Sequence, residues 1–257
     1  MPNQLPNQLP DQPPTLVLSP RYTPDSQALW RAAIQRGWHV QRLAGWSQPP
    51  ALPAGAPIVL YLEGLLAHAT AEALGLSLPE PPDDWLPRLP PEYLQRQVRL
   101  TTFAAARTAL PAFVKPPNDK SFAARVYLPG ELADQYPAEQ PVLVAEPVVW
   151  EQEFRCFVLD RSLRTASVYG RHGVPQDERG FAASEAELRE LAAFVRRLLD
   201  DDRVVLPRAV ALDVGVIAAR GWAVVELNAA WGAGIYGCDP QAVLDVVRHA
   251  TGPAAAQ

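Results

Sequence analysis

Two carboxylates and an amide near the C-terminal end of the chain are spaced so that together they could hold a metal ion. Residues 209–234 read AVALDVGVIAARGWAVVELNAAWGAG, two apolar runs joined by a tight turn at 218–221, a pattern typical of a β-hairpin. Reflection about the middle of that turn places Asp213 opposite Glu226, and Asn228 shares the face of Glu226. Like charges held opposite one another repel, and Mg²⁺ prefers such oxygen ligands. The hairpin therefore predicts a Mg²⁺ site made of Asp213, Glu226 and Asn228.

The neighbouring residues indicate that these carboxylates are not surface groups. Ala211 and Gly215 lie on the same face and leave room for a ligand. The opposite face is apolar and is expected to pack into the core; it carries Leu212, Val214, Val216, Val225 and Leu227. A strand end with two surface acids is the competing interpretation, and the apolar residues around both carboxylates disfavour it.

The order Asp213, Glu226, Asn228 and then a glycine-containing loop resembles the metal-binding hairpin of ATP-grasp enzymes. The resemblance implies that the three residues hold Mg²⁺ ions bridging the phosphates of ATP, and that loop 228–234 cradles the acceptor with its backbone N–H groups. It covers residues 92–250 well, whereas over 15–75 it is a likeness of topology. Within the family the chain looks most similar to a bacterial clade marked by paired arginine and lysine positions.

Length and composition are those of a soluble globular protein. The 257 residues are 48% hydrophobic with a net charge of −5, enough for one large core or two to three small lobes. There is no basic run, no apolar segment of ~18 residues and no signal sequence, so we expect no nucleic-acid partner, no membrane span and a cytoplasmic location. Cys156 and Cys238 have no CxxC spacing and are expected to be reduced thiols.

The order of predicted elements fits an α/β (α+β) ATP-grasp fold, a small N-terminal parallel α/β lobe followed by two mixed lobes that clamp ATP. The first lobe alternates strands with helices that end before Gly37 and Gly75. Its predicted elements are strands 15–19, 39–43 and 57–63 and helices 23–36 and 65–74. The predicted divisions are a disordered tail (1–14), the first lobe with its linker (15–90) and the ATP-grasp domain (91–257), the last comprising a nucleotide-cradling lobe (91–149) and a metal-binding lobe (150–257).

The two later lobes are predicted to be rich in strands. A helix carrying Arg96 and Arg99 is expected to begin this region. Strands are expected at 112–115, 123–128, 142–145, 153–159 and 163–169. The polar segment 170–183 reads as a long loop that could serve as a lid. A capping box at 184–187 begins a helix to about residue 199, and a final helix is expected at 240–251.

Lysine is confined to one short stretch. Of the 23 cationic residues only Lys115 and Lys120 are lysines, which suggests a place where a compact charge must meet phosphate. By the resemblance, Lys115 at the end of FVK contacts the α-phosphate. The family usually follows this lysine with a glycine-rich loop, but PPNDKSF has no glycine, and Lys120 could replace it at the β- or γ-phosphate. An ordinary strand-end lysine and a loop lysine are the alternatives.

The segment Glu146-Pro147-Val148-Val149 resembles the interlobe hinge that reads adenine. Pro147 can offer its carbonyl and Val149 its N–H. Glu153 has the spacing of the family's ribose-binding acid, and Glu151, on the same strand face, is the competing candidate. A charged edge strand is the alternative interpretation.

Arg155 shares the face of Glu153, and similar arginines meet the reacting carboxylate or the γ-phosphate. Arg171 stands where related enzymes carry another phosphate-facing cation, although a solvated loop arginine is equally consistent. Many relatives have arginine two residues before the metal aspartate, and this chain has Ala211 there. Charge developing during transfer is thus left to Arg155, Arg171 or Lys120.

The resemblance implies an ATP- and Mg²⁺-dependent ligase that activates a carboxylate as an acyl phosphate for attack by an amine. Its substrates would be small-molecule or peptide carboxylates and amines. The alternatives are an ATP-grasp phosphotransferase acting on a hydroxyl and a non-catalytic ATP-binding protein, because the fold alone does not identify the reaction.

Overall fold

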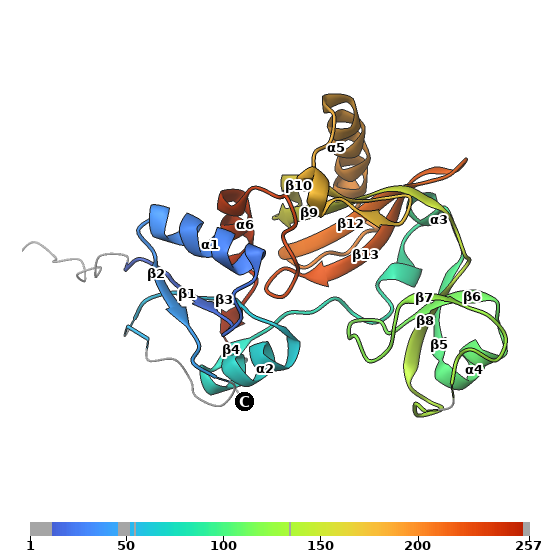
Figure 1. Ribbon diagram of the computed structural model, residues 1–257, viewed down its shortest axis with the longest axis horizontal. Coiled ribbons are helices and arrows are strands. Elements are labelled where there is room, and N and C mark those ends of the chain that lie inside the picture. The colour runs from blue at the N-terminus through green and yellow to red at the C-terminus, as the bar shows by residue number, and fades with distance from the viewer. Residues whose placement is uncertain (1–11, 46–51, 54, 134, 254–257) are drawn as a thin grey trace, which may run out of the picture.

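The computed structural model describes residues 12–45, 52–53, 55–133 and 135–253, and most of the predicted N-terminal tail lies outside them. Figure 1 shows three lobes in a row, with the five-stranded sheet of the last lobe between the other two. In the described part of the chain, no helix is long and apolar enough to cross a membrane.

The first lobe has the predicted parallel sheet. Its strands are β1 (Thr15–Leu18), β2 (His39–Arg42) and β3 (Ile58–Tyr61), in the order β2-β1-β3, and its helices are α1 (Pro24–Gln35) and α2 (Gly64–Ala73). Helix α1 begins with a capping box, in which the Ser26 amide donates to the Thr23 hydroxyl. Gly37 follows it at a φ of +72°, a conformation that glycine adopts without strain.

The linker and middle lobe contain two short helices and an antiparallel sheet. The linker carries β4 (Leu76–Ser77), which pairs with β14 (Gly252–Pro253), then η1 (Leu86–Arg88) and α3 (Pro91–Leu94). The sheet consists of β5 (Val98–Thr102), β6 (Ala112–Lys115), β7 (Arg125–Tyr127) and β8 (Pro141–Ala145), in the order β5-β8-β6-β7, with α4 (Phe103–Arg107) between β5 and β6.

The predicted helix carrying Arg96 and Arg99 is wrong. Gln95 takes a left-handed conformation, with a φ of 52°, and ends α3 there. Arg99 lies on β5, whose sequence VRLTT is rich in the β-branched residues that favour strands.

The last lobe carries the long antiparallel sheet. Its strands are β9 (Trp150–Leu159), β10 (Ser162–Arg171), β11 (Val174–Pro175), β12 (Ala209–Ile217) and β13 (Gly221–Ala229), in the order β11-β10-β9-β12-β13. Its helices are η2 (Asp177–Arg179), α5 (Glu185–Asp200) and α6 (Pro240–Val247). The predicted loop at 170–183 is partly regular, because β10 and β11 form a hairpin there and η2 follows.

The two faces of this sheet have different neighbours. One face packs against α5 in a core that includes Phe154, Leu212 and Phe194. On the other face Phe157 and Ala211 join the core of the first lobe together with α6. Arg155 and Asp213 lie two residues further along that second face, beyond the part that the first lobe covers. The sheet therefore supplies both a core and a platform for polar groups.

Candidate nucleotide and metal site

The predicted pairing of Asp213 with Glu226 is confirmed, although a β-bulge produces it. Strands β12 and β13 pair from Ile217 opposite Gly221, so uninterrupted pairing would place Val225 opposite Asp213. The register instead shifts between Asp213 and Val214, which leaves Val225 as the extra residue and brings Glu226 to Asp213. The turn is one residue shorter than predicted, and the bulge makes up the difference.

The bulge also corrects part of the predicted core face. Val224, and not Val225, is fully buried beside Val214. Leu212 and Leu227 are buried as predicted, while Val216 lies outside this core.

Asn228 joins the two carboxylates. Its side-chain amide donates to Glu226 Oε1 at 3.0 Å and approaches Asp213 Oδ2 at 3.4 Å. All three predicted metal ligands therefore lie together on one face of the hairpin.

Arg155, on the neighbouring strand β9, is committed to Asp213. Its Nε and Nη2 donate to the two oxygens of that carboxylate at 2.5 and 2.6 Å, and Nη1 donates to the carbonyl of Gly234 at 2.8 Å. The two side chains are only 6% and 1% exposed. The ring of Tyr236 covers the guanidinium, whose central carbon lies 5.0 Å from the ring centroid. Such a buried bidentate pair holds the aspartate rigidly.

Lys115 connects the middle lobe to the hairpin. It ends β6, and its ammonium forms an ion pair with Glu226. The lysine side chain is 16% exposed and the glutamate side chain 29% exposed, so the pair lies at the border of the solvent. One cation thus comes from each side of the junction between the two sheets.

The two carboxylates have opposite pKa shifts. Burial, reinforced by the nearby Glu226, raises the pKa of Asp213 to about 7, although Arg155 acts in the other direction. Burial also opposes ionisation of Glu226, but Lys115 and Asn228 outweigh it and lower the pKa of that carboxyl to about 2. The site thus holds negative charge that already requires two cations.

The donor set fits a hard divalent cation. No group of three His, Cys, Asp or Glu side chains suited to a metal occurs among the residues that the structure describes. Here the third donor is an amide, and two carboxylates with an amide oxygen are ligands that Mg²⁺ accepts. Asp213, Glu226 and Asn228 would hold the ion, in competition with the present contacts to Arg155 and Lys115.

The room predicted beside Ala211 and Gly215 is not there. Ala211 is fully buried in the core that the first lobe shares. A Cβ on Gly215 would lie 2.5 Å from the carbonyl oxygen of Gln152 and 2.8 Å from the ring of Trp150. Gly215 therefore allows Trp150 to pack closely on the sheet.

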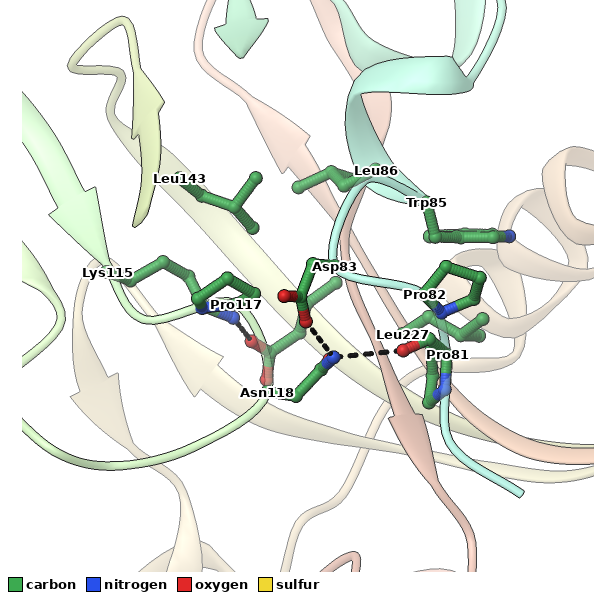
Figure 2. A pocket seen from close by; sticks show the side chains of 11 residues that line it. Pro81, Pro82, Asp83, Trp85, Leu86, Lys115, Pro117, Asn118, Leu143 and Leu227 are labelled. Carbon is green, nitrogen blue, oxygen red and sulfur yellow. Dashed lines mark hydrogen bonds and ion pairs between the residues drawn. The ribbon is translucent and has the colours of Figure 1, made fainter. Parts of the chain in front are cut away.

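A pocket lies next to the pair of Lys115 and Glu226, as Figure 2 shows. Its walls come from the linker, the segment after β6, and strands β8 and β13; they are Pro81, Pro82, Asp83, Trp85, Leu86, Lys115, Pro117, Asn118, Leu143, Glu226 and Leu227. Asn118 donates to the carbonyl of Pro81 at 2.9 Å and to Asp83 at 2.7 Å. The glycine-free segment is thereby fixed to the linker, a contact that no sequence pattern indicates.

Lys120 stays outside this cluster. It lies exposed in the segment between β6 and β7 and forms no ion pair within the described residues.

The predicted hinge connects β8 to β9. The Glu146 side chain pairs with Arg220 at the hairpin turn, at 2.6 Å, and its backbone amide donates to Gln97. The carbonyl of Val149 accepts from Ala218. The Pro147 carbonyl and the Val149 amide, the two groups expected to read adenine, have no hydrogen-bond partner in the described part of the chain.

Glu153 lies on the face of Arg155, opposite Gly170 and Gly215. The hydroxyl of Tyr169 donates to it at 3.3 Å, and burial raises its pKa. The competing Glu151 is half-buried further along the strand towards the hinge.

Arg171 is not brought to the site. It pairs with Gln152 in the sheet, one residue out of phase with Glu153, and its guanidinium binds Glu187 of α5 at 2.6 and 3.1 Å. Because α5 covers the opposite face, Arg171 is a contact between sheet and helix.

The loop after β13 packs against the first lobe. Tyr61 donates to the Ala233 carbonyl at 2.9 Å, and Asp25 accepts from the Ile235 amide at 2.9 Å. Gly234 is close to Asp25, since an added Cβ would lie 3.3 Å from its carboxylate. The segment expected to cradle the acceptor thus lies between the metal cluster and the first lobe.

Comparison with known proteins agrees with this architecture. The profile of an ATP-grasp domain, family 2 of the clade named after two arginines and a lysine, matches residues 93–246, more than half of the chain. The chain belongs to this family of ATP-grasp proteins. No curated protein matches the sequence.

Solved structures show the same fold at low identity. D-cycloserine synthetase DcsG is 15% identical with a TM-score of 0.53, over 91% of this chain and 98% of that one. A RimK domain ATP-grasp protein from Sphaerobacter thermophilus is 18% identical with a TM-score of 0.51, over 91% and 99%. D-alanine–D-alanine ligase from Bacillus anthracis is 12% identical with a TM-score of 0.51, over 93% and 97%. The ATP-grasp fold extends over the first lobe as well.

Proposed function

We propose that this protein is an ATP- and Mg²⁺-dependent ligase that joins a carboxylate to an amine through an acyl phosphate. One observation carries the proposal: Asp213, Glu226 and Asn228 converge where two sheets meet, with Arg155 and Lys115 in direct contact with the carboxylates. This concentration of opposite charges at a lobe junction suits a polyphosphate and its metal ions.

Each residue has a proposed part. Lys115 releases Glu226 to bind the α-phosphate, and Lys120 reaches the outer phosphates from its exposed segment. The Pro147 carbonyl and Val149 amide bind adenine beside Glu146, and Glu153 binds the ribose. Mg²⁺ at the hairpin would neutralise charge on the phosphate oxygens.

The proposed reaction has two steps. A carboxylate oxygen of the substrate attacks the γ-phosphorus, and the bond to the leaving ADP oxygen breaks. An amine then attacks the carbonyl carbon of the acyl phosphate, loses a proton and expels phosphate. Arg155 holds Asp213 in place and contacts the Gly234 carbonyl, so it fixes the loop expected to face the acceptor.

D-Cycloserine synthetase and D-alanine–D-alanine ligase share the fold, and their names are consistent with a small-molecule substrate class. A macrocyclase, MdnC, bound with its precursor peptide MdnA also shares it, with a TM-score of 0.51 at 11% identity, so a peptide substrate is equally in keeping. We propose a cytoplasmic enzyme whose partners are these substrates, with neither nucleic acid nor membrane.

Two alternatives use the same site. A phosphotransferase would pass the γ-phosphoryl group to a hydroxyl, and a non-catalytic protein would bind ATP without turnover. The glycine-free segment fixed through Asn118 is the observation that favours the second, because it restrains the chain next to Lys115.

The test is ADP release from ATP and Mg²⁺ with pooled carboxylates, in the presence of hydroxylamine as the amine. A ligase gives a hydroxamate, because hydroxylamine intercepts the acyl phosphate, and mass spectrometry identifies the carboxylate. Glu226→Gln should abolish the product, while Glu131→Gln, an exposed acid in the middle lobe, should not. ADP release with pooled alcohols and no hydroxamate would support the phosphotransferase, and nucleotide binding without ADP release from any pool would refute an enzyme.

A further inference from the structure

The β-bulge that brings Glu226 to Asp213 is held from outside the hairpin by Arg96. Its Nη1 donates to the carbonyl of Val224 at 2.7 Å and its Nη2 approaches the carbonyl of Val225 at 3.3 Å. These are the two residues at which the register of β13 shifts. One guanidinium therefore binds both carbonyl groups of the bulge.

Those carbonyl groups lie on the edge strand of the sheet. Strand β13 is last in the order β11-β10-β9-β12-β13, with β12 as its one neighbour in the described sheet. An edge strand leaves backbone groups without ladder partners, and a bulge disrupts the ladder further. Arg96 supplies donors that a neighbouring strand would otherwise provide.

The position of Arg96 is itself well defined. Its Nη1 also donates to the carbonyl of Leu94 at 3.1 Å, and the left-handed turn at Gln95 directs the chain from α3 towards the hairpin. The guanidinium lies over the ring of Trp150, 4.9 Å from its centroid. Burial lowers the pKa of Arg96 to about 10, so the side chain remains charged at neutral pH.

The register of the hairpin determines whether a metal site exists. Without the extra residue, Val225 would lie opposite Asp213, and Glu226 would lie opposite Leu212 on the core face. A one-residue slip would thus separate the two carboxylates onto opposite faces of the sheet. The cluster depends on the bulge, and the bulge depends on its outward carbonyl groups being satisfied.

We propose that Arg96 is a positioning residue of the metal site, which fixes the bulge at Val225 and so holds Glu226 opposite Asp213. This inference rests on the proposed function, because it assumes that the hairpin holds the metal of an ATP complex.

The first measurement is a titration of the full chain with Mn²⁺ in the presence of ATP, followed by electron paramagnetic resonance. Arg96→Met should raise the Mn²⁺ dissociation constant about tenfold or more, since hydrogen bonds from a charged donor are lost. Arg99→Met is the matched control, an exposed arginine three residues away, and should stay within about twofold of the parent. Binding of ATP without metal should change less than Mn²⁺ binding in Arg96→Met.

A second background separates register from general stability. Deleting Val225 removes the extra residue, so Asp213 and Glu226 pair directly without a bulge. In that deletion variant Arg96→Met should no longer affect Mn²⁺ binding, within about threefold, because the two changes act on one element. An undiminished effect of Arg96→Met in the deletion background would overturn the inference.

A third measurement needs neither metal nor nucleotide. Cross-strand nuclear Overhauser contacts between Asp213 and Glu226 should be present in the parent and weakened or lost in Arg96→Met, while Arg99→Met keeps them. Retained contacts in Arg96→Met would refute the positioning role. A parent chain that shows these contacts but binds no Mn²⁺ with ATP would instead refute the proposed function and leave Arg96 as a positioning residue of the hairpin.

Discussion

Removing Arg155 should destabilise the whole protein, because it leaves the buried carboxylate of Asp213 without its partner. The aspartate side chain is 1% exposed and receives two hydrogen bonds from the guanidinium. The relevant change is Arg155→Met, which keeps most of the side-chain volume and removes the charge and the donors.

The expected loss follows from the burial of the pair. Truncating one partner of a buried ion pair typically costs about 3–5 kcal/mol, because the remaining charge is uncompensated. In a chain of this size that corresponds to a fall in melting temperature of about 6–20 °C. The lost bond from Arg155 to the carbonyl of Gly234 adds to the cost.

The assay is urea unfolding at pH 7.5 of the parent, Arg155→Met, and Arg155→Met with Asp213→Asn. Removing the stranded charge should return at least about 1 kcal/mol, so the double variant should be more stable than the single one. An exposed pair gives the control, since Arg208→Met should cost less than about 1 kcal/mol. A single variant as stable as the parent would show that the pair contributes nothing and that Arg155 is free for other contacts.

Two further predictions concern Lys115 and Glu187. Lys115→Ala should abolish binding of a non-hydrolysable ATP analogue in isothermal titration, and Lys115→Arg should not restore it, because a planar guanidinium is too large beside Glu226; parent-like affinity of the arginine variant would contradict this. The hydrogen bonds from Arg171 lower the pKa of Glu187 from 4.5 to about 2, against the effect of burial, so its stabilisation is complete above pH 4.5 and lost as the pH falls towards 2. Glu187→Gln should therefore cost about 1 kcal/mol of unfolding free energy at pH 7, with the difference from the parent shrinking between pH 4.5 and 2; a constant difference in urea unfolding over that range would refute the ion pair.

Local sequence patterns predicted the elements that depend on local chemistry. The capping box at Thr23 and Ser26 and the one at Ser184 and Glu187 both begin helices where expected. The parallel order of the first lobe and the hairpin pairing of Asp213 with Glu226 also followed from alternation and turn residues. These features are determined within a few residues of chain.

The remaining parts depend on contacts between distant segments. The bulge at Val225 involves Arg96, about 130 positions earlier, and a helix was wrongly predicted there because β-branched spacing after Gln95 was overlooked. The commitment of Arg155 to Asp213 depends on the alignment of β9 with β12, which no local pattern specifies. Arg171 has a partner on α5 that only the packing of that helix reveals.

The central claim is that Asp213 and Glu226 bind the metal of an ATP complex, and thermal unfolding with and without ATP and Mg²⁺ tests it most directly. At one hundred times the dissociation constant, bound ligand adds about 2.7 kcal/mol, or about 5–11 °C in melting temperature for a chain of this size. The account predicts this rise for the parent and for Glu131→Ala with Asp160→Ala, which removes two exposed acids. It predicts loss of the rise for Asp213→Ala with Glu226→Ala, and an unchanged rise in that double variant would contradict the metal site.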